Sequence, residues 1–297
     1  MSAETELPTE KKNTHKETAT YHQAAFAAFN YLLRKYKHNG DVELKDNHKL
    51  SKEPLEIDIM VIKKKANVKI TESWGQIFRE HNIIEYKSPV DKPVSLDVFN
   101  KVIHGYTGIY ASNNNLSLPQ ISTTIVCFKK PTKLFEQLKS ELNYKILQKD
   151  KGIYYISINE SVESMSLAIQ FVVSSELDDS DLTLKALRSK IDEETAKKVL
   201  TLPIEDDKYD VSLSQWWKVM LLINGKKLAE LLEKETDMRR QNEFFSVLEQ
   251  KGLLTDFKQK WARQEMEKVA RNMLDMGIDV NTIAKATGLF VDDILRL

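Results

Sequence analysis

The stretch NIIEYKSP, residues 82–89, sets two charged side chains into a short apolar segment. An apolar run of this length that ends in Ser-Pro predicts a buried β-strand. Residues two apart on a strand point to the same face of the sheet, so Glu85 and Lys87 share one side. Because charged groups are rarely buried unless they are paired or bind a metal, this strand is the first place to look for a site.

A second apolar stretch, PLEIDIMVI at residues 54–62, carries Asp58 and also predicts a strand. If the two strands are neighbours, the carboxylates of Asp58 and Glu85 converge with the ammonium group of Lys87. Two carboxylates can hold Mg²⁺ or Mn²⁺, and a lysine can orient or deprotonate a water and balance developing charge. This combination indicates metal-assisted phosphodiester hydrolysis. The alternative is a same-face ion pair between Glu85 and Lys87, with Asp58 as a solvated edge residue.

The order of an Asp on one strand and Glu-x-Lys on the next resembles the PD-(D/E)xK nuclease superfamily, also called restriction-endonuclease-like. Residues from about 21 to 177 are similar to bacterial transposase-derived or recombination-promoting nuclease-like proteins. The stretches that carry the similarity are KEPLEIDIMVIKK (52–64), IFREHNIIEYKSPVD (77–91), FNKVIHGYTGIY (99–110) and GIYYISI (152–158).

The resemblance implies an Mg²⁺-dependent (or Mn²⁺-dependent) DNA endonuclease related to mobile elements or recombination. It gives Asp58 and Glu85 the role of metal ligands and Lys87 that of the catalytic lysine. Two features depart from the superfamily pattern: Glu56, not Pro-Asp, leads into Asp58, and the helix at 21–36 contains no acidic residue. The alternative function is therefore a nuclease-fold module that binds DNA or protein without cleaving. Incubation of plasmid with the protein and Mg²⁺ discriminates the two.

Hydrophobic periodicity predicts an α/β fold with a mixed sheet flanked by helices. The expected elements follow the order α-β-β-β-α-β, which the nuclease superfamily core shares. They are a helix at 21–36, strands at 42–50, around Asp58 and around Glu85, a crossover helix at 95–110 and a strand at 121–128, followed by a helix at 133–142 and two strands within 144–158.

Composition divides the chain into four expected parts. Residues 1–20 are polar and predict a disordered N-terminus, and 21–177 form the nuclease-like core. The acidic stretch 178–210 predicts a connector, and 211–297 a mostly helical C-terminal region. Its last twenty residues have helix-turn-helix spacing, with Asp279 as a helix cap and Gly288 in the turn. Since the second of these helices carries Asp292 and Asp293, packing or oligomerisation is favoured over DNA reading.

Positive charge is concentrated in one part of a chain whose formal net charge is zero. Residues 31–150 contain 20 Lys and Arg against 14 Asp and Glu. Within them, Lys63, Lys64, Lys65 and Lys101 are candidates for contacts with DNA phosphates, although such runs are also common on solvated surfaces.

The chain of 297 residues is long enough for a buried core, and its composition is that of a globular protein. The single cysteine, Cys127, excludes an internal disulfide and lies in an apolar stretch that predicts a core position. No run approaches the roughly 18 apolar residues of a membrane span, and the polar N-terminus does not resemble a signal peptide. A cytoplasmic protein without membrane contact is expected.

Overall fold

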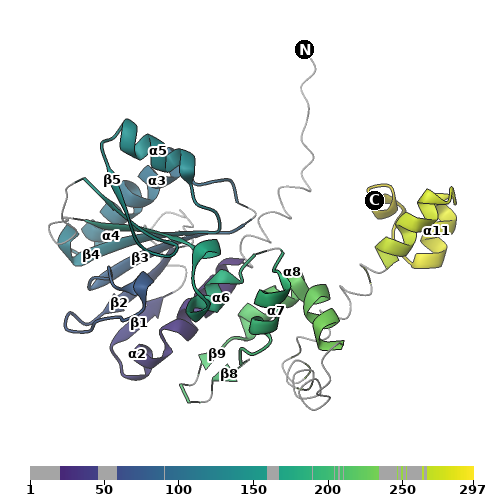
Figure 1. Cartoon of the computed structure of the whole chain (residues 1–297), viewed down its shortest axis with the longest axis horizontal. Helices are drawn as coiled ribbons and strands as arrows, with labels where there is room; N and C mark the ends of the chain where they lie inside the picture. Colours follow the sequence, from purple (N-terminus) through teal and green to yellow (C-terminus); the bar gives the residue numbers. More distant parts are fainter. Residues whose placement is uncertain are drawn as a thin grey trace. The chain divides into compact units, whose positions relative to one another are not determined.

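The structure is a computed structural model, shown in Figure 1. It describes residues 21–45, 59–89, 91–158, 167–188, 190–203, 205–206, 208–209, 211–233, 246, 249, 252, 263 and 266–297. The chain divides into two compact units, Met1–Val219 and Met220–Leu297.

The first unit is built around a seven-stranded mixed sheet with the order β1-β2-β3-β4-β7-β6-β5. The β1-β2-β3 and β5-β6-β7 segments pair antiparallel, whereas β4 is parallel to both β3 and β7. This arrangement confirms the predicted α/β fold with a mixed sheet. The strands are β1 (Val42–Lys45), β2 (Ile59–Lys64), β3 (His81–Lys87), β4 (Ile121–Cys127), β5 (Lys145–Asp150), β6 (Ile153–Ser157) and β7 (Ala168–Val173).

The central strands are buried along their whole length, because helices cover both faces of the sheet. One face packs on α3 (Leu96–Asn100), η2 (Lys101–Tyr106), α4 (Thr107–Asn113) and α5 (Thr132–Ser140). This face includes Phe171 of β7. Its neighbour Gln170 therefore points to the opposite face, where it donates a hydrogen bond to the carbonyl of Trp74.

Trp74 connects the segments that pack on this opposite face. It lies in η1 (Ser73–Gly75), and its ring packs edge-on against Phe29 of the helix at residues 21–32. The indole Nε1 donates to the buried Asp181 carboxylate at 2.8 Å. The predicted first helix is confirmed up to residue 32, followed by α2 (Arg34–His38) and a stop at Gly40, where φ is +68°.

The crossover helix between β3 and β4 has a feature that the sequence did not predict. Ser95 accepts a bond from the Val98 N–H at its start, as a helix cap does. The helix then changes at Lys101–Tyr106 into a π-helical turn, and it continues as α4 to Asn113. Periodicity alone predicted one helix at 95–110, because Leu96, Phe99, Ile103 and Tyr106 are spaced as the apolar residues of a regular helix.

Strand β7 was also missed by the sequence analysis, although it occupies the centre of the sheet between β4 and β6. Its sequence, AIQFVV, is only six residues long and has Gln170 in the middle. A short apolar run of this kind is ambiguous between strand and helix by periodicity. The burial of Gln170 is explained by its hydrogen bonds to Trp74 and Thr124.

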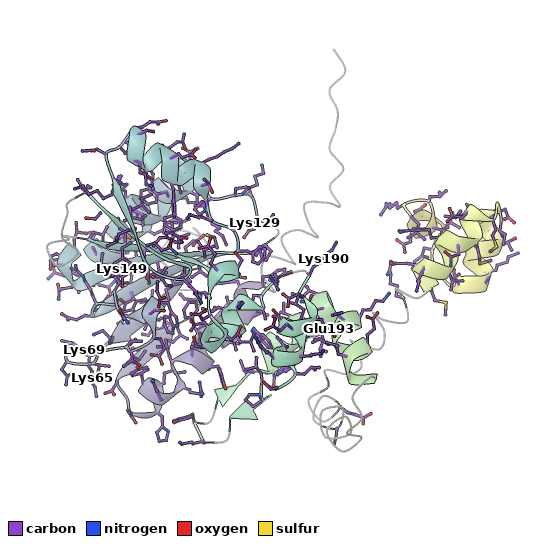
Figure 2. All side chains as sticks on the ribbon, viewed as in Figure 1. Lys65, Lys69, Lys129, Lys149, Lys190 and Glu193 are labelled. Carbon is purple, nitrogen blue, oxygen red and sulfur yellow. The ribbon has the colours of Figure 1, made fainter. Side chains whose placement is uncertain are left out.

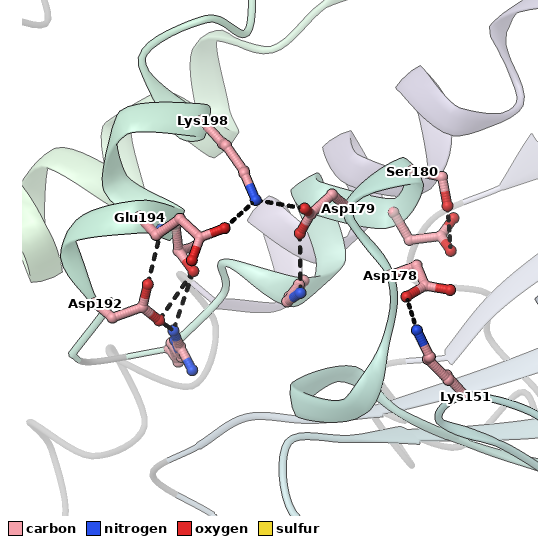
Figure 3. Close-up of polar contacts among 11 residues, drawn as sticks. Lys151, Asp178, Asp179, Ser180, Asp192, Glu194 and Lys198 are labelled. Carbon is pink, nitrogen blue, oxygen red and sulfur yellow. Dashed lines mark hydrogen bonds and ion pairs between the residues drawn. The ribbon is translucent and has the colours of Figure 1, made fainter.

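The acidic stretch 178–210, which the sequence predicted to be a connector, contains helices and buried side chains. It includes η5 (Asp179–Asp181), α6 (Leu182–Lys185) and α7 (Glu193–Val199), and it buries Leu184, Leu187 and Val199. Figure 3 shows how cations of the same unit neutralise its acids. Lys198 pairs with Asp179 and Glu194, Lys185 with Asp179, and Lys151 with Asp178.

The second unit is helical in its described residues, as predicted. Helix α8 (Ser214–Glu233) crosses the boundary between the two units. Residues 266–275 are helical, α11 (Val280–Thr287) is capped by Asp279, and α12 (Val291–Ile294) follows Gly288, where φ is +71°. Ala270, Ile283 and Ile294 form the small core of this part. No helix among the described residues is long and apolar enough to cross a membrane.

Candidate active site

Glu85 and Lys87 lie on β3 near the middle of the sheet, between β2 and β4. The Lys87 Nζ and Glu85 Oε1 atoms are 2.6 Å apart, and the exposed fractions of the two side chains are 27% and 9%. The sequence prediction that both residues share one face is therefore confirmed. A charged pair that is this deeply enclosed is exceptional on a strand whose other central residues are apolar or amide.

The charge state of this pair follows from its surroundings. Burial lowers the pKa of the Lys87 ammonium group. The charge and hydrogen bond of Glu85, with smaller contributions from Asp91 and Tyr106, outweigh burial and raise that pKa above its ordinary value. Lys87 is therefore a cation at neutral pH. This state suits a lysine that orients a water or balances negative charge better than one that removes a proton.

The third predicted residue, Asp58, lies outside the described residues. Its neighbour Ile59 begins β2, and the Cα of Ile59 lies opposite that of Glu85 in the antiparallel β2–β3 register. The β2–β3 pairing thus places the first residue of β2 opposite Glu85.

The crossover helix covers this face of the sheet and carries Lys101, which the sequence assigned to DNA contacts, and Tyr106, which it did not assign to the site. The ring of Tyr106 belongs to the apolar core beneath the helix, which also contains Ile83 of β3. Lys101, a predicted DNA contact, stacks its ammonium over the Tyr106 ring at 5.3 Å from the centroid. The only sequence signal for Tyr106 was its place on a helix that follows the Glu85 strand.

The loop after β3 contributes a further acid. Asp91 accepts a hydrogen bond from the Ser88 N–H at 2.7 Å and returns one from its own N–H to the Ser88 carbonyl. Its charge also favours the ammonium form of Lys87. Asp91 thus closes the turn that follows Lys87 and adds negative charge beside it. An Asp three residues after a Ser-Pro start is a common turn signal, which is why the sequence did not distinguish it as a site residue.

The lysine run is not part of the same cluster. Lys63 pairs with His81 at the other end of the two strands, four residues from the Ile59–Glu85 pair. At about 3.3 Å per residue, the separation along the strand is roughly 13 Å. Lys64 donates to the Val68 carbonyl at 2.7 Å, and burial lowers its pKa. These lysines line a separate cavity of about 440 Å³, together with Gly40, Asp41, Val42, Glu43, Glu80 and His81.

Carboxylate oxygens are ligands that suit Mg²⁺, and Glu85 places one such group beside Lys87. Among the residues that the structure describes, no group of three or more His, Cys, Asp or Glu side chains gathers around a metal-sized site. Asp58, the second predicted ligand, is not among these residues.

Comparison with known proteins gives one result. Residues 263–297 match the family model of the Rpn/YhgA-like nuclease family, C-terminal HTH domain. No curated protein and no solved structure matches the chain. The match supports a relation to that family and suggests a nuclease or DNA-binding role. It covers the C-terminal domain and does not extend to β3.

Helix α12 of this C-terminal domain carries acids and is not a basic helix. In α12, Asp292 is exposed, and Asp293 forms an ion pair with Arg263 at 2.9 Å. Phe290 and Leu295, which flank these acids, are 77% and 68% exposed. Acids repel DNA phosphates, whereas exposed large apolar side chains are typical of protein contacts.

Proposed function

We propose that the chain is an Mg²⁺-dependent DNA endonuclease of the PD-(D/E)xK type. The observation that carries the proposal is the enclosed Glu85–Lys87 pair on β3, opposite the first residue of β2. The match of residues 263–297 to a domain of a nuclease family supports the same reading independently, because it concerns a different part of the chain.

In this proposal Glu85 and Asp58 hold the cation, and Lys87 faces the phosphodiester and the attacking water. The cation, when bound, supplies a Lewis acid that polarises the phosphate and makes water a better nucleophile. The chain itself supplies position and charge. Lys87 is held as a cation by Glu85, so its ammonium can orient the water and stabilise the extra negative charge that develops in the transition state.

The proposal places a condition on Asp58. Residues that face each other in an antiparallel pair share a face, and a shift of one residue changes the face. Since Ile59 is opposite Glu85, a regular strand would direct residue 58 to the other face. Regular pairing must therefore end or bulge before Ile59 if Asp58 is to reach Glu85.

The experiment is cleavage of plasmid DNA by the purified protein with Mg²⁺ or Mn²⁺. The wild type should convert supercoiled plasmid to nicked or linear forms, and Lys87→Ala should reduce the rate by at least 100-fold. Lys69→Ala serves as the matched control, because Lys69 is exposed on the loop that follows β2 and is labelled in Figure 2 beside Lys65. Equal rates for wild type and Lys87→Ala would contradict the proposal.

The second candidate is a module that keeps the fold and binds DNA or protein without cleaving. The observation that favours it is the lack of any acidic residue in the helical region 21–36, where many PD-(D/E)xK members add a ligand. Absence of cleavage with either cation, together with retained DNA binding, would favour this candidate.

A further inference from the structure

The π-helical turn at Lys101–Tyr106 changes which residues of the crossover helix share a side. In an α-helix, positions five apart are rotated by about 140° from each other, because each residue turns the helix by 100°. A π-turn instead joins residues five apart by its hydrogen bonds. Lys101 and Tyr106 are five apart, and their ammonium and ring are in contact at 5.3 Å. The π-turn therefore places Lys101 and Tyr106 on the same side of the helix, whereas a regular α-helix would turn them to different sides.

Buried hydroxyl groups hold this turn in place. The Thr107 N–H bonds to the Val102 carbonyl, five residues back, and the Thr107 hydroxyl donates to the same carbonyl at 3.1 Å. The Thr107 hydroxyl also contacts the Thr123 hydroxyl of β4 at 2.8 Å, and both residues are fully buried. Thr123 lies opposite Ile83 of β3. Strand β4, which pairs with the Glu85 strand β3, thus holds the π-turn in place through Thr123.

The hydroxyl of Tyr106 lies at the edge of the apolar core. Only 7% of the residue is exposed, and its ring belongs to the core. Its hydroxyl has no hydrogen-bond partner within the described residues, yet it is not among their fully buried polar atoms. The hydroxyl therefore keeps contact with solvent. Ile83, two residues before Glu85 on β3, belongs to the same core cluster as Tyr106. Alternation along the strand therefore turns Glu85 and Lys87 towards the face of the sheet that the Tyr106 helix covers.

Lys101 differs from Lys87 in its electrostatic environment. Lys87 is paired with Glu85, whereas Lys101 is exposed and has no ion pair to any acid in the described parts of the chain. Its ammonium is therefore free of a direct ion pair, although Asp97 lies one helical turn before it, and its contact with the Tyr106 ring limits the directions in which it can extend. An exposed lysine without an ion pair, in contact with the ring of a tyrosine, is suited to a phosphate group.

We propose that the π-turn aligns Tyr106 and Lys101 as a phosphate-contacting pair for a DNA strand that lies across Glu85 and Lys87. Tyr106 donates a hydrogen bond to a non-bridging oxygen of the phosphodiester at Lys87, and Lys101 binds the adjacent phosphate. Thr123 is a positioning residue, since it acts through Thr107 and the turn. This assignment deepens the proposed endonuclease and rests on it for the location of the strand.

The first test is DNA binding in EDTA, measured by fluorescence anisotropy of a labelled duplex over a salt series. Lys101→Ala should weaken binding about 3- to 10-fold and reduce the slope of log K against log salt by about 0.9, the value for one lost phosphate contact. The control Lys69→Ala removes an exposed lysine that is not part of the pair and should leave both quantities unchanged.

The second test is cleavage at saturating DNA. Tyr106→Phe removes a single hydroxyl and should lower kcat about 10- to 100-fold, with an unchanged melting temperature. Tyr144→Phe is the matched control, because Tyr144 packs on Phe99 of the same helical cover and lies outside the pair. Thr123→Val should lower affinity as Lys101→Ala does, and Thr123→Ser, which keeps the hydroxyl, should restore it.

The outcomes separate this inference from the proposed function. If the wild type binds DNA but does not cleave it, the endonuclease proposal fails, and the effect of Lys101→Ala on the salt slope still decides the phosphate contact. If the wild type cleaves and both Lys101→Ala and Tyr106→Phe behave as wild type, the phosphate-contacting pair is refuted while the endonuclease stands. A folded wild type without affinity for DNA at low salt would overturn both.

Discussion

Ile59, the first residue of β2, lies directly opposite Glu85 in the antiparallel β2–β3 pair. This register puts the beginning of one strand beside the only carboxylate on the other. It connects the two sequence stretches from which the nuclease hypothesis started, and it limits the conformations in which Asp58 could take part.

A crystal structure with bound Mn²⁺ or Mg²⁺ should show oxygens of Asp58 and Glu85 on the same cation, with Mg²⁺–oxygen distances of about 2.0–2.1 Å. The strand should depart from regular pairing just before Ile59, because a regular strand would turn Asp58 to the other face. An Asp58 carboxylate on that other face would rule out the two-carboxylate site.

Asp58→Ala should abolish binding of Mn²⁺ in isothermal titration calorimetry and abolish cleavage with it. Lys87→Ala should retain cation binding and lose cleavage, because the lysine acts on water and charge and is not a ligand. Unchanged cation affinity in Asp58→Ala would remove Asp58 from the ligand set, whatever the effect on activity.

Variants of the Glu85–Lys87 pair should show how each charge affects the stability of the folded protein. Lys87→Met leaves the buried Glu85 carboxylate without its salt-bridge partner and should destabilise the protein by about 1–3 kcal/mol, since loss of one partner of an enclosed pair is unfavourable. The double variant Glu85→Gln with Lys87→Met removes both charges and should recover most of this loss. Urea denaturation of the three proteins measures it. A double variant as unstable as the single one would indicate that the pair itself stabilises the fold.

The Trp74–Asp181 contact predicts a pH-dependent stability. Burial raises the pKa of Asp181, and the hydrogen bonds from Trp74 and Ser180 offset this only partly. A carboxyl group whose pKa is higher in the folded state disfavours folding above that pKa, and the penalty disappears as the pH falls towards the unfolded value.

Asp181→Asn keeps an acceptor for Trp74 without the charge, so it should equal or exceed the wild type in stability at pH 7, with a difference that shrinks near pH 4. Asp181→Ala, which leaves the buried indole N–H without this acceptor, should lose about 1–3 kcal/mol. Thermal melts between pH 4 and pH 7 provide the measurement. A wild type more stable than Asp181→Asn at pH 7 would contradict the burial argument.

Deletion of residues 263–297 should leave the salt slope of DNA binding nearly intact, because Asp292 and Asp293 give α12 an unfavourable charge for phosphates. If Phe290 and Leu295 form a contact between copies of the chain, the deletion should also reduce the number of chains per particle, as measured by light scattering. A slope that falls by several units on deletion would instead assign DNA binding to this domain.

Much of the fold followed from local sequence patterns. The order of elements from the first helix to β4, the turns at Gly40 and Gly288, and the capping of α11 by Asp279 are decided by periodicity and turn chemistry within a few residues. The shared face of Glu85 and Lys87 also follows from the two-residue repeat of a strand. These features depend on interactions between neighbours in the chain, which the sequence displays directly.

Other features were decided by contacts between distant residues. The central position of β7 depends on its pairing with β4 and β6, and the burial of Gln170 depends on Trp74, 96 residues away in the chain. The π-turn is fixed by Thr123 on another element, and it alone brings Lys101 onto the Tyr106 ring. A sequence specifies which side chains are available, but the energy that selects a π-helical turn or a buried amide comes from partners that only the folded chain brings within reach.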